Sequence, residues 1–176
     1  MITAWSFANI VTGAAQATLT ELVATPEAAV NPATVRFCPL VPGNIAWDAC
    51  DCAGQLAFSI QRIVPTTTYP IDGSNQAAQG GCEPPGLMAE CLASWNRCTP
   101  GMSEDGKAPP CSNLYASALL FQGTQFAMRN AITTYLCGQR NARPQGVFDF
   151  RVGAASFPGP DGNCASVEIP FSFLLR

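Results

Sequence analysis

The sequence of this 176-residue chain predicts an α+β fold, in which two helices pack on one face of a mostly antiparallel four-stranded sheet, in the order α-β-β-α-β-β. Two long stretches repeat apolar residues every three or four positions, which is the period of a helix. Four shorter stretches alternate apolar with polar residues, which is the period of a strand. One core between a helix layer and a sheet buries all of these apolar faces. The length suits a single domain over residues 1–176.

The first predicted helix runs from Met1 to Thr25. Its apolar positions fall at steps of three and four: Ala4, Ala8, Val11, Ala15, Leu19 and Leu22. Pro26 disfavours helical geometry at Thr25, so the helix should end there. The pattern after the next loop is compatible with a brief strand over Val35 to Phe37, ended by the following prolines and not counted among the four.

Two predicted strands follow, separated by a long loop. From Gly54 to Val64 the residues Leu56, Phe58 and Ile60 occupy one face of the strand. The stretch from Leu87 to Cys98 alternates less regularly, so a short helix is the competing interpretation. The loop from Thr66 to Pro85 is long for a compact domain, which is typical of a segment with a role outside the fold.

The second predicted helix begins after a cap at Ser112 and ends at Gly138, where a left-handed cap belongs. Its predicted buried face consists of Leu114, Ala118, Phe121, Met128, Ile132 and Tyr135. The last two strands, 148–154 and 165–175, form an antiparallel hairpin with a turn-rich connection. Pro170 cannot donate a ladder hydrogen bond, which places it at an edge or a bulge.

The composition favours a protein that buries surface against partners. Charged residues make up only 12% of the chain, which predicts an unusually apolar surface. The net charge is −3 and the basic residues are scattered, so no patch for gripping nucleic acid is predicted. There is no apolar run of membrane-spanning length and no signal-peptide pattern at the N-terminus. We therefore expect synthesis and folding in the cytosol, without a membrane.

The residues do not favour an enzyme or a cofactor site. Histidine is absent, which excludes triads built on it, and nucleotide-binding glycine motifs are missing. A zinc site from Cys38, Cys50, Cys52 and Cys82 is the most specific alternative. Structural zinc sites usually use cysteine pairs separated by two to four residues, whereas only Cys50 and Cys52 are close in this sequence, and one residue separates them. Asp48 and Asp51 are more typical of turn caps than of an acid/base pair. Three tryptophans, Trp5, Trp47 and Trp95, are expected to pack in the fold, with sugar stacking as the alternative.

Nine cysteines leave the redox state open. The candidates for disulfides are Cys50, Cys52, Cys82, Cys98 and Cys111. Cys98 and Cys111 bracket a polar loop, and a bridge between them would remove about 3 kcal/mol of unfolded-state entropy. Cytosolic thiols stay reduced, so such bridges would form only after release from the cell.

One stretch carries a family resemblance, through Val41, Pro42, Gly43, Ile45, Ala46, Trp47, Asp48, Cys50, Cys52, Gly54, Gln55 and Leu56, and then Arg62 to Pro65. It resembles a signature of neck proteins from siphophages that infect actinobacteria, of the kind generally assigned as tail terminators. Ala53 departs from that pattern as an extra residue. Weaker matches follow in the same order at Arg97, Cys98, Pro100, Gly106, Pro109, Cys111, Gly162 and Cys164. The resemblance spans most of Val35 to Arg176.

The resemblance implies a structural virion protein at the head-tail neck, without catalysis or cofactor. Tail terminators form a ring, usually hexameric, that caps the tail tube and ends its polymerisation. The implied partners are further copies of the chain, the major tail tube protein and the head-side stopper or connector, with DNA only passing through the lumen. A stopper or connector ring of the same neck is one alternative. A secreted, disulfide-rich binding module is the alternative outside phages.

Two polar loops, 66–85 and 99–110, are the predicted partner-contacting segments, because each is long and too polar for the core. The candidate interface residues on them are Asp72, Asn75, Gln79, Glu104, Asp105 and Lys107.

Overall fold

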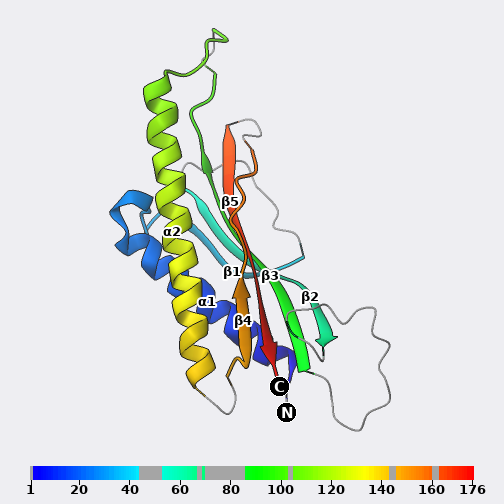
Figure 1. The fold of residues 1–176 in the computed structure, drawn as a ribbon. Coiled ribbons are helices and arrows are strands. Elements are labelled where there is room, and N and C mark those ends of the chain that lie inside the picture. The colour runs from blue at the N-terminus through cyan, green and yellow to red at the C-terminus, as the bar shows by residue number, and fades with distance from the viewer. Residues whose placement is uncertain are drawn as a thin grey trace.

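The computed structural model describes residues 2–43, 53–66, 69, 86–102, 105–142, 146–159 and 163–176 (Figure 1). The elements are α1 (Ala4–Ala24), the 3-10 turn η1 (Pro26–Ala28), β1 (Arg36–Pro42), β2 (Gln55–Thr66), β3 (Gly86–Cys98), α2 (Cys111–Asn141), β4 (Asp149–Val152) and β5 (Cys164–Leu175). The strands form one sheet in the order β1-β2-β3-β5-β4. The predicted α+β class is confirmed.

The sheet differs from the prediction in having five strands and one parallel pair. The added strand is β1, which lies parallel to β2, while the other neighbouring strands pair antiparallel. The prolines at 39 and 42 do not end it, because β1 is an edge strand that needs ladder hydrogen bonds on one side only. The register shifts between Cys38 and Val41, so Pro39 falls in the irregular part of the ladder.

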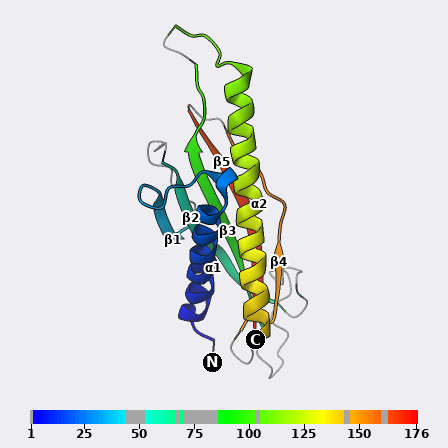
Figure 2. The same cartoon turned by 90° about the vertical axis from the view of Figure 1, so that its left-hand side faces the viewer.

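Both helices cover the same face of the sheet, α1 over β1 and β2, and α2 over β4 and β5 (Figure 2). The face of β3 and β5 toward the helices is built from every second residue: Ala89, Cys91, Ala93, Trp95, Val167, Ile169, Phe171, Phe173 and Leu175. An aromatic contact joins the two layers, with ring centroids 5.9 Å apart for Phe7 of α1 and Phe173 of β5, and a second one lies within the sheet, with centroids 5.9 Å apart for Phe58 of β2 and Phe171 of β5. The core therefore lies between one helix layer and one face of the sheet.

The competing interpretation of Leu87 to Cys98 as a helix is wrong, because this stretch is β3, between β2 and β5. Its alternation looks irregular because both of its faces are buried. Trp95 points into the helix-side core, and Met88, Ser94 and Asn96, at alternate positions, are buried as well. A strand buried on both sides does not show a clean apolar and polar alternation.

The helices differ in detail from their predicted faces and ends. The buried residues of α1 are Phe7, Ile10, Val11, Ala14, Ala15, Thr18 and Leu22, so its inner face is turned relative to the prediction. α2 begins at Cys111 and continues through Gly138 to Asn141. At the C-terminus the predicted hairpin is confirmed. Pro170 lies beyond the last β4–β5 pair, where its carbonyl oxygen accepts a hydrogen bond from the amide of Gly153.

Gly54 generates a prediction for stability. Its φ is 93°, and a Cβ at this position would overlap the buried ring of Trp95. Replacement by alanine combines left-handed strain with overpacking, so Gly54→Ala should lower the free energy of unfolding by about 2 kcal/mol or more. Urea unfolding monitored by circular dichroism measures this change.

Gly43→Ala is the matched control for that variant. Gly43 has a φ of 65°, but nothing lies within 4 Å of its added Cβ. Only the left-handed strain remains, so the loss should be about 1 kcal/mol. Equal losses for the two variants would contradict the packing of Gly54 against Trp95.

Candidate functional site

The N-terminal part of α2 extends past the elements on which the rest of the helix packs (Figures 1 and 2). Gly123 lies directly against the backbone of Glu27 in η1, and Thr124 is the first buried residue of α2. None of the residues 111–122 is buried. We call these twelve residues the overhang. The predicted buried face is therefore wrong for Leu114 and Ala118, which are exposed, whereas Phe121 is partly buried and packs against the core.

The overhang presents large apolar side chains to solvent. Leu114, Tyr115 and Leu119 are 45%, 66% and 49% exposed, and Phe126, just beyond the overhang, is 68% exposed. No residue from Cys111 to Met128 carries a charge. Exposed aromatic and aliphatic side chains without neighbouring charges are characteristic of surfaces that bind another protein. The overhang is thus the candidate functional site of the described residues.

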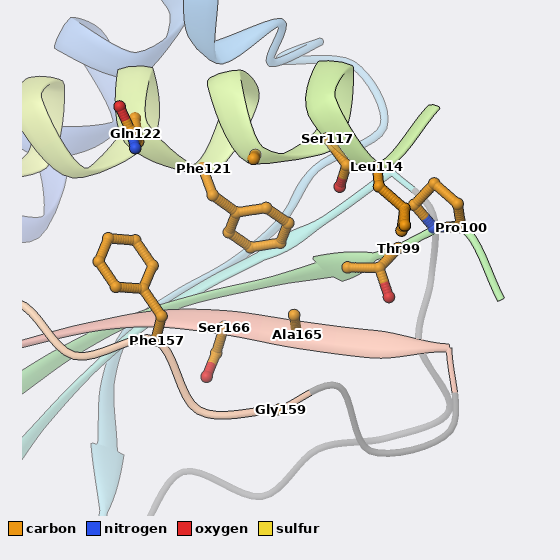
Figure 3. Close-up of a pocket in the computed structure, with 11 residues that line it drawn as sticks. Thr99, Pro100, Leu114, Ser117, Phe121, Gln122, Phe157, Gly159, Ala165 and Ser166 are labelled. Carbon is orange, nitrogen blue, oxygen red and sulfur yellow. The ribbon is translucent and has the colours of Figure 1, made fainter. Parts of the chain in front are cut away.

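A pocket of about 360 Å³ lies beneath the overhang (Figure 3). It is open to solvent and is bounded by α2, by the start of β5 and by the chain that leaves β3. The described residues of its lining include no charged side chain and are Thr99, Pro100, Leu114, Ser117, Ala118, Phe121, Gln122, Phe157, Gly159, Ala165 and Ser166. A concave apolar surface with a few polar groups is the usual character of a binding pocket.

The floor of the pocket is held by backbone hydrogen bonds to β5 and its preceding turn. The Ser166 amide donates to the carbonyl oxygen of Pro158 at 3.0 Å, and the Thr99 amide donates to that of Asn163 at 2.7 Å. Ala165 points toward α2, whereas the hydroxyl of Ser166 points away from it (Figure 3). The space between the helix and the strand is therefore lined mainly by carbon atoms on a fixed frame.

Trp5 is the second unexpected apolar group. It lies in the first turn of α1 and is 77% exposed, so the prediction that it packs in the fold is wrong. Trp95 is buried as predicted, and Trp47 lies outside the described residues. Trp5 is exposed because it lies off the inner face of α1, which is formed by residues such as Phe7, Val11 and Leu22.

The predicted bridge between Cys98 and Cys111 is not formed. Cys98 and Cys164, which face each other in the β3–β5 register, are both disulfide-bonded, whereas Cys111 is a free thiol. Cys98 ends a strand inside the sheet, while Cys111 is exposed at the start of α2, which accounts for the difference. Cys50, Cys52 and Cys82 lie outside the described residues.

Most of the predicted interface residues are also outside the described part of the chain, namely Asp72, Asn75, Gln79 and Glu104. Asp105 and Lys107 are described and exposed, in the segment that leads into the overhang. Tyr69 holds one point of the long loop against β5, because its hydroxyl lies 3.0 Å from the carbonyl oxygen of Ser172. Burial raises the pKa of Tyr69, which keeps this phenol protonated as a donor.

Within the described ranges, no cluster of three or more histidine, cysteine, aspartate or glutamate residues is placed to hold a metal ion. The predicted zinc site draws on Cys38, a free thiol, and on three cysteines outside those ranges. No helix in the described part of the chain has the length and apolar character to cross a membrane.

No family model and no curated protein matches the chain.

The free cysteines generate a prediction for thiol reactivity. Cys111 and Cys137 are exposed, whereas Cys91 is buried under the helices, and burial, followed by the charge of Glu90, raises its pKa well above the usual range. A raised pKa keeps the thiol protonated, and the thiolate is the reactive form. Iodoacetamide at pH 8 should therefore modify Cys111 and Cys137 in the folded protein and leave Cys91 unmodified, as read by peptide mass spectrometry.

Urea provides the control, because Cys91 should react once the protein is unfolded. Modification of Cys91 in the folded protein at the rate of Cys111 would contradict its buried position.

Proposed function

We propose that this chain is a structural virion protein that forms a ring at the head-tail junction of a siphophage. The ring, usually hexameric in such proteins, caps the tail tube, ends its polymerisation and docks it to the head-side connector, while DNA passes through the lumen. The support for this identity is the resemblance of the stretch around Val41 to Leu56, with its weaker continuation to Cys164.

The observation that carries self-assembly is the overhang. Its residues Leu114, Tyr115 and Leu119 are exposed on a helix segment without charged residues. Exposure of these side chains to water costs free energy, and this free energy is regained when another protein covers them. A monomer that worked alone would gain nothing from extending α2 past η1. A ring of identical copies gives this surface a partner in every position.

The sheet adds a second route to contact between copies. β1 and β4 are its edge strands, and an edge strand has unpaired backbone groups that another chain can use. A closed ring requires a heterologous contact, in which one surface of a copy meets a different surface of the next. The asymmetric ends of this molecule suit that requirement.

A secreted, disulfide-stabilised binding module is the second candidate, because Cys98 and Cys164 are disulfide-bonded. Disulfides persist in oxidising surroundings outside the cell. A virion released from its host meets the same surroundings, so oligomeric state separates the two candidates better than redox state. A stopper or connector ring of the same neck predicts the same ring but a different position along the particle.

Sedimentation of the purified chain tests this proposal. The expected result is a discrete assembly of about six copies that appears as a ring in negative-stain images. The ring should also halt growth when it is added to polymerising tail tube protein. A chain that remains monomeric and leaves tube length unchanged would contradict the proposed function, and a disulfide-dependent monomer in the culture medium would favour the secreted module.

A further inference from the structure

Two complementary apolar features lie at opposite ends of this elongated molecule. Trp5, in the first turn of α1, lies at the end that also holds the N-terminus of the chain. The pocket beneath the overhang lies at the other end, where α2 begins. Both views of the fold show the two helices running in opposite directions, with these ends far apart (Figures 1 and 2). A copy therefore cannot fill its own pocket with its own Trp5.

We propose that Trp5 of one copy inserts into the pocket beneath the overhang of the next copy. This inference rests on the proposed function, since it identifies the contact between neighbouring subunits of the ring. The occupant is a second copy of this chain, and the contact joins two different surfaces. Such a head-to-tail contact repeats in one direction until the ring closes.

Charged side chains are absent from the first part of α1 and from the described lining of the pocket. The lining has no ionisable side chain among the residues that the structure describes, and α1 has none from Ala4 to Thr20. Insertion of Trp5 into the pocket therefore does not bury a charged side chain of either of these two segments, which would otherwise oppose binding. Interfaces are depleted of charge at their centre in the same way.

The chemistry of indole also fits the pocket. Indole is a large apolar ring with one N–H donor, and such a ring prefers an apolar site with an acceptor at its edge. Phe121 and Phe157 supply aromatic walls, and the hydroxyl of Ser117 supplies an acceptor on the helix side (Figure 3). The volume of about 360 Å³ is far more than a single water requires.

Trp5 lies off the inner face of α1, so the monomer leaves most of its ring in water. At 77% exposed, it is the most exposed large apolar residue among those described, on a helix whose other face is well packed. Tryptophan is the residue most enriched among those that dominate binding energy at interfaces. Its position at one end of the molecule gives it reach to a neighbouring copy.

Two variants remove the two halves of this contact. Trp5→Ala removes the inserted ring, and Ala118→Trp fills the pocket of the same chain. Each should weaken assembly by roughly tenfold or more in sedimentation equilibrium. Both positions are exposed in the monomer, so the urea unfolding curves of the variants should match that of the parent chain.

Two matched controls accompany them. Ile63→Ala removes an exposed large apolar side chain on β2, which belongs neither to α1, nor to the overhang, nor to the pocket lining. Thr134→Trp adds the same side chain at an exposed position of the same helix, outside both the overhang and the pocket lining. Both controls should assemble like the parent chain. Loss of assembly in the controls equal to that in the test variants would overturn the inference.

A mixture of the two test variants gives the sharpest result. Trp5→Ala keeps an intact pocket and Ala118→Trp keeps an intact Trp5, so the mixture should form a one-to-one pair and nothing larger. A mixture that stays monomeric overturns the inference. If the parent chain and Trp5→Ala assemble equally well, the inference is overturned, but the proposed ring is not.

The remaining outcomes concern other occupants. A parent chain that is monomeric at all concentrations overturns both the inference and the proposed function. Native mass spectrometry that finds a small apolar molecule bound to the parent chain, and lost in Ala118→Trp, overturns the inference in favour of a ligand site. A full ring in the parent chain, with a one-to-one pair in the mixture, supports it.

Discussion

The structure depends on a mismatch in length between its two helices. α1 has 21 residues and α2 has 31, so that at 1.5 Å per residue α2 is about 15 Å longer than its neighbour. The extra length adds no fully buried residue to the core, because the buried residues of α2 begin only at Thr124, beside η1. Everything distinctive about the surface follows: an uncharged overhang, exposed aromatic and aliphatic side chains, and a pocket between the overhang and β5.

The sequence was sufficient for the fold class, because the period of apolar residues survives in most elements. β2 and β5 alternate clearly, and both helices show their period, although the inner face of α1 is centred on Phe7 rather than on the smaller alanines. Two features could not be predicted in the same way. β1 contains prolines that an edge strand tolerates, and β3 is buried on both faces, so neither shows a regular pattern.

The candidate site was less predictable, since it depends on residues that only the fold brings together. The pocket draws on Thr99, Leu114, Phe157 and Ala165, which lie up to 66 residues apart in the chain. Periodicity placed Leu114 in the core, because a single-sequence pattern does not show where the supporting layer ends. A signal was nevertheless present, in the run without charge from Cys111 to Met128. Such a run on a helix that is half exposed indicates an interface.

The central claim is that the overhang is covered by a neighbouring copy in an assembled ring. A cryo-electron microscopy reconstruction of the assembled protein tests this most directly, because it shows what lies against residues 111–122. The account predicts that the overhang is buried between adjacent subunits, with the N-terminal end of the neighbouring α1 against it. An assembly in which the overhang of every subunit faces solvent would contradict the account.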